Sequence, residues 1–112
     1  MNERRQARFR ELIQSRLAEI EREDALGEAG QATVELDQQA VGRLSRMDAL
    51  QSQAMAKAQA ARRQIERTRL TAALARMAED EYGYCEDCGE PIAAARLELD
   101  PATTRCIGCA SG

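Results

Sequence analysis

The chain has 112 residues, of which 16 are Lys or Arg and 19 are Asp or Glu, and it contains four cysteines and no histidine. Three aromatic residues are too few for a large globular core, whereas an alanine-rich, charged composition is typical of paired helices. No apolar run approaches the roughly 18 residues of a membrane span, so none is expected.

The first predicted element is an amphipathic helix over about residues 3–27. Its apolar residues follow the three-and-four spacing of one helical face; they are Phe9, Leu12, Ile13, Leu17 and Ile20. Gly27 and Gly30 each cost roughly 1 kcal/mol of helix stability relative to alanine, so the helix is predicted to end at the first of them. Residues 28–44 give mixed signals and are predicted to form the tip that connects two helices.

The second predicted helix covers about residues 45–81. Ser45 is a suitable N-cap, and Asp48 follows three residues later, where an acid supports the cap. No glycine or proline interrupts the segment before Gly83. Its apolar and small residues form a stripe close to a heptad pattern: Met47, Leu50, Ala54, Ala58, Ala61, Ile65, Thr68 and Ala72.

A helix of this length does not bury such a stripe by itself. We therefore expect the first helix to fold back as an antiparallel partner, with Phe9, Leu17 and Ile20 packed on the stripe. The predicted fold is mainly α: an antiparallel two-helix coiled-coil hairpin over residues 1–81, followed by a small four-cysteine zinc module over residues 82–112. This arrangement predicts a monomer.

The cysteines form two pairs, Cys85 with Cys88 and Cys106 with Cys109. The spacing C-x2-C-x17-C-x2-C lies in the range of four-thiolate zinc sites, because each short pair places two sulfurs on one turn. Gly89 follows the first pair, where a positive φ lets backbone N–H groups turn toward the sulfurs. One structural Zn²⁺ is predicted, held by all four cysteines.

Other interpretations of the cysteines fit less well. Two disulfides are typical of small secreted proteins, but the N-terminus shows no apolar signal core, and a cytoplasmic location is expected. A thioredoxin-type redox pair needs a strand before the first cysteine, and none is predicted. An enzyme is not expected, because the chain lacks a histidine base and four cysteine ligands leave zinc no open position.

The charge is unevenly distributed along the chain. Residues 79–112 carry two arginines against eight acids, whereas residues 1–78 carry a small positive excess. Four thiolates around one Zn²⁺ add about two more negative charges. A DNA-binding finger needs a basic face for phosphates, so direct sequence-specific DNA binding is not expected.

The residues around the cysteines resemble those of the DksA/TraR family of bacterial transcription regulators. The likeness rests on the segments Tyr-Gly-Tyr-Cys-Glu-Asp-Cys-Gly-Glu-Pro-Ile at 82–92, Ala-Arg-Leu at 95–97, and Cys-Ile-Gly-Cys at 106–109, and the helical layout before them is similar too. The chain looks like a short, divergent member. The resemblance implies a protein that binds RNA polymerase, inserts the coiled-coil tip through the secondary channel toward the active site, and often acts with guanosine tetraphosphate.

The resemblance also assigns residues at the tip and on the second helix. The family's acidic tip motif, Asp-x-x-Asp-x-Ala, aligns with residues 42–47, which lack both acids. The expected partner-binding residues are Arg43, Ser45, Arg46, Asp48 and Ala49 at the tip, Arg62 for polymerase contact, and Arg69 for the nucleotide's phosphates. Two further basic positions fall on Asp100 and Ala110, so the response to guanosine tetraphosphate is expected to be weak or absent.

Two alternatives from other functional classes remain open at this point. One is an adaptor or homodimer in which a zinc-ended coiled coil binds another protein partner. The other is a thiol redox sensor in which oxidants eject the zinc and reshape the base of the hairpin.

Overall fold

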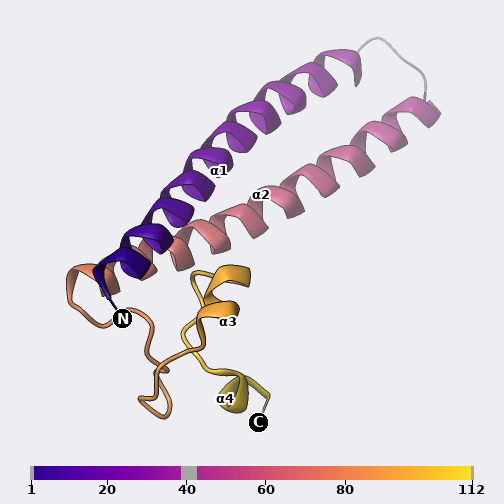
Figure 1. The fold of residues 1–112 in the computed structure, drawn as a ribbon. Coiled ribbons are helices and arrows are strands. Elements are labelled where there is room, and N and C mark those ends of the chain that lie inside the picture. The colour runs from indigo at the N-terminus through magenta and orange to yellow at the C-terminus, as the bar shows by residue number, and fades with distance from the viewer. Residues whose placement is uncertain (1, 39–42, 112) are drawn as a thin grey trace. The chain divides into compact units, whose positions relative to one another are not determined.

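The computed structural model describes the backbone of residues 2–38 and 43–111, and the side chains of residues 2–28 and 46–111. Two long helices, α1 (Glu3–Gln38) and α2 (Arg43–Ala78), are followed by two short ones, α3 (Ala94–Leu99) and α4 (Ile107–Ser111) (Figure 1). In these described ranges the only extended pairing is an isolated bridge between Tyr84 and Pro91. The predicted fold, a helical hairpin with a C-terminal zinc module, is confirmed.

The long helices extend beyond their predicted tip-side ends. Helix α1 continues through Gly27 to Gln38, and α2 begins at Arg43. Residues 39–42 lie outside the described residues, and the predicted tip, 28–44, overlaps both helices. A Cβ atom at Gly27 would lie 3.2 Å from Nη2 of Arg63, so this glycine marks a close approach of the Arg63 side chain.

Helix α2 ends at Ala78, three residues before the predicted boundary. Asp80 adopts a left-handed conformation with φ of 59°. The N–H of Glu81 donates to the carbonyl of Arg76 at 2.9 Å, and the N–H of Asp80 donates to Met77 at 3.3 Å. This is the Schellman pattern, which satisfies the last carbonyls of a helix and turns the chain away.

The chain divides into two compact units, one of residues Met1–Leu17 with Arg67–Gly112 and one of residues Ala18–Glu66. The first unit contains nearly all of the buried apolar side chains. They come from the start of α1, the end of α2 and the segment after it: Phe9, Ile13, Leu70, Ala73, Met77, Tyr82, Ile92, Leu97 and Ala102. The first unit is therefore a single small core built from distant parts of the sequence.

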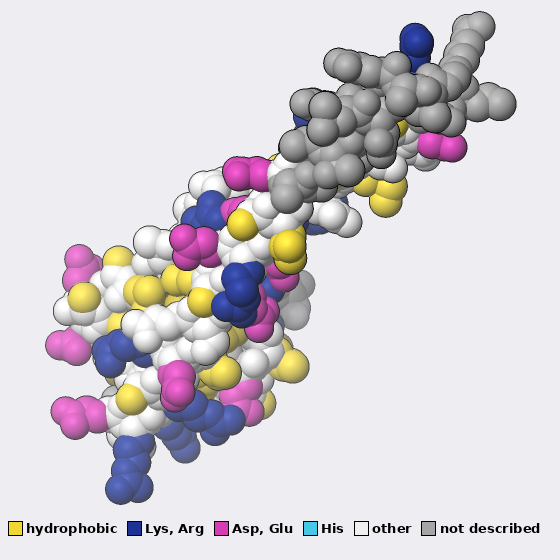
Figure 2. Space-filling model, turned by 90° about the horizontal axis from the view of Figure 1, so that it is seen from above, with side chains coloured by type: hydrophobic (Ala, Val, Ile, Leu, Met, Phe, Trp, Pro, Cys, Tyr) yellow, Lys and Arg dark blue, Asp and Glu magenta, His cyan; other side chains and the backbone are white. Residues whose placement is uncertain are grey.

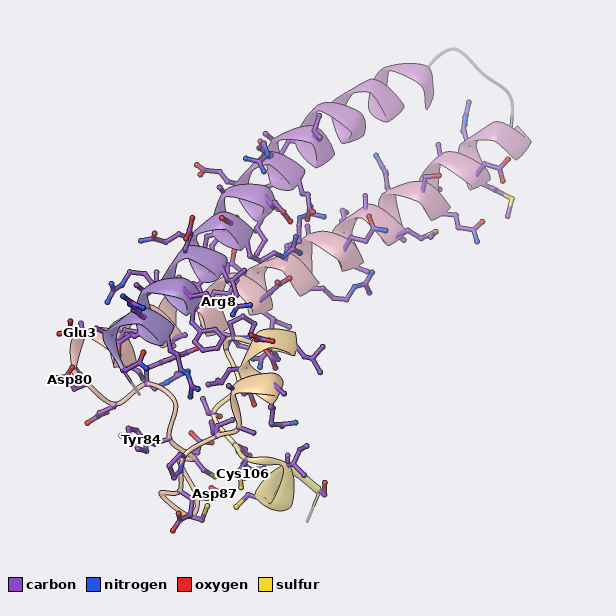
Figure 3. All side chains as sticks on the ribbon, in the orientation of Figure 1. Glu3, Arg8, Asp80, Tyr84, Asp87 and Cys106 are labelled. Carbon is purple, nitrogen blue, oxygen red and sulfur yellow. The ribbon has the colours of Figure 1, made fainter. Side chains whose placement is uncertain are left out.

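Specific contacts hold this first unit together. The rings of Phe9 and Tyr82 lie 6.1 Å apart at 50°, within the range of favourable aromatic pairs. Arg8 of α1 points toward α3 and forms an ion pair with Glu98 at 3.0 Å (Figure 3). Both partners of this pair are well exposed, so the ring contact contributes more than the ion pair does.

In the second unit, the two helices meet through a narrow, largely polar contact. Nε of Arg63 donates to Oδ1 of Asp24 at 2.6 Å, and the two side chains are only 15% and 28% exposed. The half-buried residues of α2 here have mostly small or polar side chains: Ala49, Gln53, Ala56, Ala60 and Arg63. Small side chains let two helices approach closely, and Ile20 of α1 is fully buried.

The prediction that the first helix packs on the stripe of α2 was wrong. Every residue of that stripe, from Met47 to Ala72, is exposed. Phe9 and Ile20 are buried and Leu17 is half-buried, but the face of α2 that is turned inward is the one that carries Ala56, Ala60 and Arg63. The Arg63–Asp24 pair accounts for this choice, because turning the stripe inward would carry a partly buried, hydrogen-bonded charge away from its partner.

Candidate metal centre

The first cysteine pair lies in a loop tied by backbone hydrogen bonds. The N–H of Cys85 donates to Glu90 at 2.9 Å, and the N–H of Gly89 donates to Cys85 at 2.9 Å. Gly89 has a φ of 76°, as the sequence predicts. A residue with a side chain is strained at this φ, so the glycine permits the tight turn that brings Cys88 back beside Cys85.

The second pair is positioned by α4. Cys106 directly precedes this short helix and Cys109 lies within it, so the two sulfurs project from one helical turn. The N–H of Ala110 donates to Cys106 at 2.9 Å. A bond of 2.8 Å from Glu86 N–H to Thr104 joins the loop of the first pair to the segment before the second. The fold thus brings together two pairs separated by 17 residues.

The four sulfur atoms converge on one point. All of them lie within 4.8 Å of one another, and the sulfurs of Cys88 and Cys106 are 3.8 Å apart. Zinc–sulfur bonds of about 2.3 Å place two thiolates of a tetrahedral site about 3.8 Å apart, so the observed cluster has the dimensions of a four-cysteine zinc site. The donor set fits one structural zinc ion, as predicted, and it provides four ligands with no open coordination position.

The protein environment treats the four thiols differently. Backbone hydrogen bonds from Cys106 and then Cys88 lower the pKa of Cys85 to about 6. Side-chain hydrogen bonds with Cys106, Cys85 and Cys88 raise the pKa of Cys109 to about 12. Zinc binds thiolates, so it must displace the remaining protons, and zinc affinity falls as the pH is lowered.

Arg105 links the two halves of the module. Its Nε lies 2.9 Å from Oδ2 of Asp87 and 3.8 Å from Oε1 of Glu86, both within the first knuckle. Its carbonyl accepts a hydrogen bond of 2.8 Å from Nε of Arg96. A cation next to Cys106 also offsets part of the negative charge that four thiolates leave around Zn²⁺. No motif in the sequence predicted this role for Arg105.

Tyr82 anchors the module to the core. Its side chain is 2% exposed, and its hydroxyl donates to the carbonyl of Pro101 at 2.8 Å. Burial raises the pKa of Tyr82 to about 12. The hydroxyl therefore remains a hydrogen-bond donor throughout the neutral range. Its bond links Tyr82 to Pro101, which lies 19 residues further along the chain.

This raised pKa predicts a loss of stability in alkali. Since the folded pKa lies above the unfolded value of about 10, the contribution of Tyr82 is complete below pH 10 and declines as the pH rises toward 12. The decline is expected to reach about 1.4 kcal/mol per pH unit. Denaturant titrations of the zinc-loaded protein across about pH 9–11.5 measure it, and Tyr82→Phe should flatten the curve. An equal slope in Tyr82→Phe would contradict this assignment.

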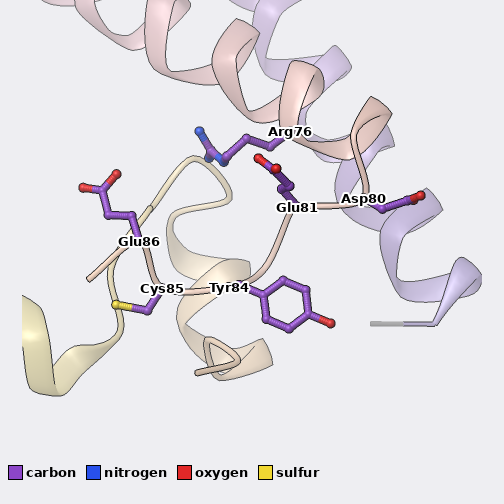
Figure 4. Close-up of a pocket in the computed structure, with 6 residues that line it drawn as sticks. All are labelled: Arg76, Asp80, Glu81, Tyr84, Cys85 and Glu86. Carbon is purple, nitrogen blue, oxygen red and sulfur yellow. The ribbon is translucent and has the colours of Figure 1, made fainter. Parts of the chain in front are cut away.

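A hollow of about 310 Å³ lies beside the first knuckle (Figure 4). It is lined by Arg76, Asp80, Glu81, Tyr84, Cys85 and Glu86. Nη2 of Arg76 is buried and has no hydrogen-bond partner among the described residues. Three carboxyl groups against one guanidinium make the lining negative, which disfavours a phosphate ligand.

The predicted partner-binding residues fall in both units. Arg46, Asp48 and Arg62 are exposed on α2, and Ala49 is half-buried. The backbone of Arg43 and Ser45 belongs to α2, but their side chains lie outside the described ones. Arg69 lies in the first unit, where its Nη2 donates to Oδ2 of Asp100 at 2.8 Å. The sequence did not predict this pair, although the family resemblance placed Arg69 and Asp100 at the same expected nucleotide site.

The geometry defines the class of protein as a helical hairpin that carries a structural four-cysteine zinc module. Residues 80–112 match the model of the prokaryotic DksA/TraR C4-type zinc finger. The resemblance of the zinc module to the DksA/TraR family, seen in the sequence, is confirmed over these residues.

A stretch of this chain is similar to curated transcription factors. It is 45% identical over 40 residues to the RNA polymerase-binding transcription factor DksA of Caulobacter vibrioides, covering 36% of this chain and 28% of that protein. With the DksA of Escherichia coli the identity is 42% over 36 residues, or 32% of this chain and 24% of that protein. The matched region thus spans about a quarter of the length of these relatives.

The fold likeness extends over nearly the whole chain. The structure of transcription factor DksA2 from Pseudomonas aeruginosa matches with a TM-score of 0.87 over 99% of this chain and 84% of that one, at 24% identity. At this identity the match shows the shared fold, including the two long helices that the module comparison does not reach. No helix within the described ranges combines the length and apolar character that a bilayer span requires.

Proposed function

We propose that this protein is a non-enzymatic, cytoplasmic regulator of transcription that binds RNA polymerase directly, with the hairpin in the secondary channel and its tip near the active site. One observation carries the proposal: a module whose relatives are named RNA polymerase-binding transcription factors is joined to a hairpin with the DksA2 fold. The acidic C-terminal segment, residues 79–112, has eight acids against two arginines and fits a protein partner better than a DNA duplex.

Binding to polymerase is tested with purified components. The zinc-loaded protein should bind core RNA polymerase in a mass-resolved titration and change transcription from a ribosomal promoter. DNA alone, at the same salt concentration, should not be retained. If the protein neither binds core polymerase nor changes transcription, the proposal is wrong.

Charge reversal on α2 should separate binding from regulation. Arg62 is exposed and lies away from the tip, so Arg62→Glu is expected to weaken polymerase binding by about 1–3 kcal/mol if the contact is desolvated. Arg46→Glu and Asp48→Arg lie near the tip and should alter transcription more than affinity. Arg22→Glu on α1 is the matched control, because it changes the same charge at another exposed position. Unchanged binding and transcription in all three α2 variants would refute these assignments.

Guanosine tetraphosphate should modulate this protein weakly or not at all. Of three expected basic positions only Arg69 is present, and Asp100 already occupies its guanidinium at 2.8 Å. A phosphate at this site must displace that carboxylate and then face its charge, whereas each charge-assisted contact is worth roughly 1.5–3 kcal/mol.

The response is measured as transcription with and without the nucleotide, on a polymerase that lacks its other site for the effector. Asp100→Arg with Ala110→Lys should increase the response, because it frees Arg69 and adds two cations. Arg69→Ala should lower it further. Strong potentiation of the unmodified protein would contradict the expectation.

A further inference from the structure

The second unit, residues 18–66, has more large apolar side chains outside than inside. Among its described side chains, Ile20 is the one large apolar residue that is buried. Exposed ones are found on both helices and are 58–74% accessible: Leu26, Met47, Leu50, Met55 and Ile65. Hydrophobic side chains are visible at the surface among charged ones in Figure 2. Several large apolar side chains exposed on one small unit are typical of an interface.

Three of these residues belong to one face of α2. We use the name exposed stripe for Met47, Leu50, Ala54, Ala58, Ala61 and Ile65, all of which are exposed. At about 3.6 residues per turn these positions fall within roughly a quarter of the helix circumference, and Ile65 returns to the direction of Met47 after about five turns. The half-buried face with Ala56, Ala60 and Arg63 lies on the opposite side of α2 from the exposed stripe. The exposed stripe is thus long, straight and uncovered within the unit.

We propose that the exposed stripe binds the same stripe of a second copy of this chain, with the two α2 helices antiparallel. The order of side-chain sizes is nearly the same from both ends, with Met47 and Leu50 at one end, alanines in the middle and Ile65 at the other. A twofold axis near residue 56 sets Met47 opposite Ile65 of the second copy. The central alanines then let the helices approach closely, as an isologous interface requires.

Charges along one edge of the stripe select this orientation. Asp48, Met55 and Arg62 recur at intervals of seven and lie on the same side of the stripe. In the antiparallel dimer, Asp48 lies opposite Arg62 of the second copy, twice by symmetry, and the two Met55 side chains meet near the axis. A parallel dimer would instead set Asp48 against Asp48 and Arg62 against Arg62. Neither residue forms an ion pair with another described residue of its own chain.

The other edge limits the affinity. Lys57 is exposed on that edge, and the twofold axis brings it near its own copy, which is unfavourable. One helical face about five turns long is also at the small end of specific interfaces, so the dissociation constant is expected to be on the order of 100 µM. The expectation of a monomer depended on the stripe being covered within the chain, and it is not. The dimer would cover Asp48 and Arg62, so polymerase and a second copy would compete for this face.

The test is the mass of the zinc-loaded protein in solution, measured by sedimentation equilibrium from about 10 µM to about 1 mM. We expect the weight-average mass to rise from one chain toward two. Asp48→Arg and Arg62→Asp should each abolish the rise, and the double variant, which restores opposite charges across the interface, should recover it. Lys57→Gln should strengthen association several-fold. Ala58→Glu, in the centre of the stripe, should keep the protein monomeric.

Control variants distinguish this interface from non-specific association and from misfolding. Glu21→Arg with Arg22→Asp makes an equivalent charge exchange on exposed α1 positions and should leave association unchanged. Helix content and zinc stoichiometry of every variant show that it folds. A monomeric mass at about 1 mM for both the unmodified protein and Lys57→Gln would overturn the proposal. So would association that the double charge exchange fails to recover. If polymerase is the sole occupant of the stripe, the protein remains monomeric and the stripe variants lose polymerase binding only.

Discussion

Removal of zinc is expected to unfold residues 82–112 and to disrupt the hydrophobic core to which they contribute. The sulfur atoms of the four cysteines lie within 4.8 Å of one another, and the module around them buries only a few apolar side chains, among them Ile92, Leu97 and Ala102. Apparent zinc-binding free energies of about 10–16 kcal/mol in small zinc modules far exceed what such a core supplies. Chelation of the zinc should therefore abolish the dispersed amide signals of the module in NMR spectra.

The same result is expected from Cys85→Ser, which leaves three thiolates and a poor fourth ligand. Glu90→Gln is the matched control, because it changes an exposed side chain in the same loop and retains the carbonyl that accepts the bond from Cys85. Elemental analysis should give one zinc per chain for the unmodified protein and for Glu90→Gln. A substoichiometric metal content, or a module that stays ordered in chelator, would contradict a structural zinc.

Phe9→Ala is expected to cost about 3–5 kcal/mol of unfolding free energy, a large part of the stability of a domain this small. Phe9 is 2% exposed, and its ring contacts that of Tyr82. The substitution removes a buried ring from a core that several distant segments share, so it leaves a cavity that the surrounding structure fills only in part.

The control for Phe9→Ala lies one turn away on the same helix. Leu12→Ala removes an apolar side chain that is 41% exposed, and it should cost about 1 kcal/mol or less. Urea titrations of the zinc-loaded proteins compare the two. Equal losses would show that Phe9 is not part of the core. A double-mutant cycle with Tyr82→Ala then measures the ring contact itself.

Local chemistry made much of this protein predictable from the sequence. Four cysteines as two C-x2-C pairs, with no histidine to compete, indicate one zinc site whatever surrounds it, because the ligand types and their spacing define it. The glycine after the first pair predicted the left-handed turn that Gly89 adopts. The existence of two long helices followed equally from local propensity and periodicity.

The choice of which face of α2 is turned inward depended on the tertiary structure. The sequence offers two faces at helical spacing, one with Met47, Leu50 and Ile65 and one with small residues and Arg63. Hydrophobicity favours the first. The structure uses the second, because Arg63 reaches Asp24 of α1 across 39 residues, and no local pattern reports such a pair.

Contacts between residues that are distant in the sequence also explain why the structure differs from the predictions at Gly27 and Asp100. The low helix propensity of Gly27 predicts a helix end, but α1 continues through it, and Nη2 of Arg63 lies 3.2 Å from where a Cβ would be. The family resemblance predicts a basic residue at the position of Asp100, but only the fold shows that the Asp100 carboxylate pairs with Arg69. By itself the sequence determined the metal, its ligands and the helical class, because these depend on neighbours along the chain. The tertiary structure decided which charges pair and which apolar face remains open, because those depend on residues that only folding brings together.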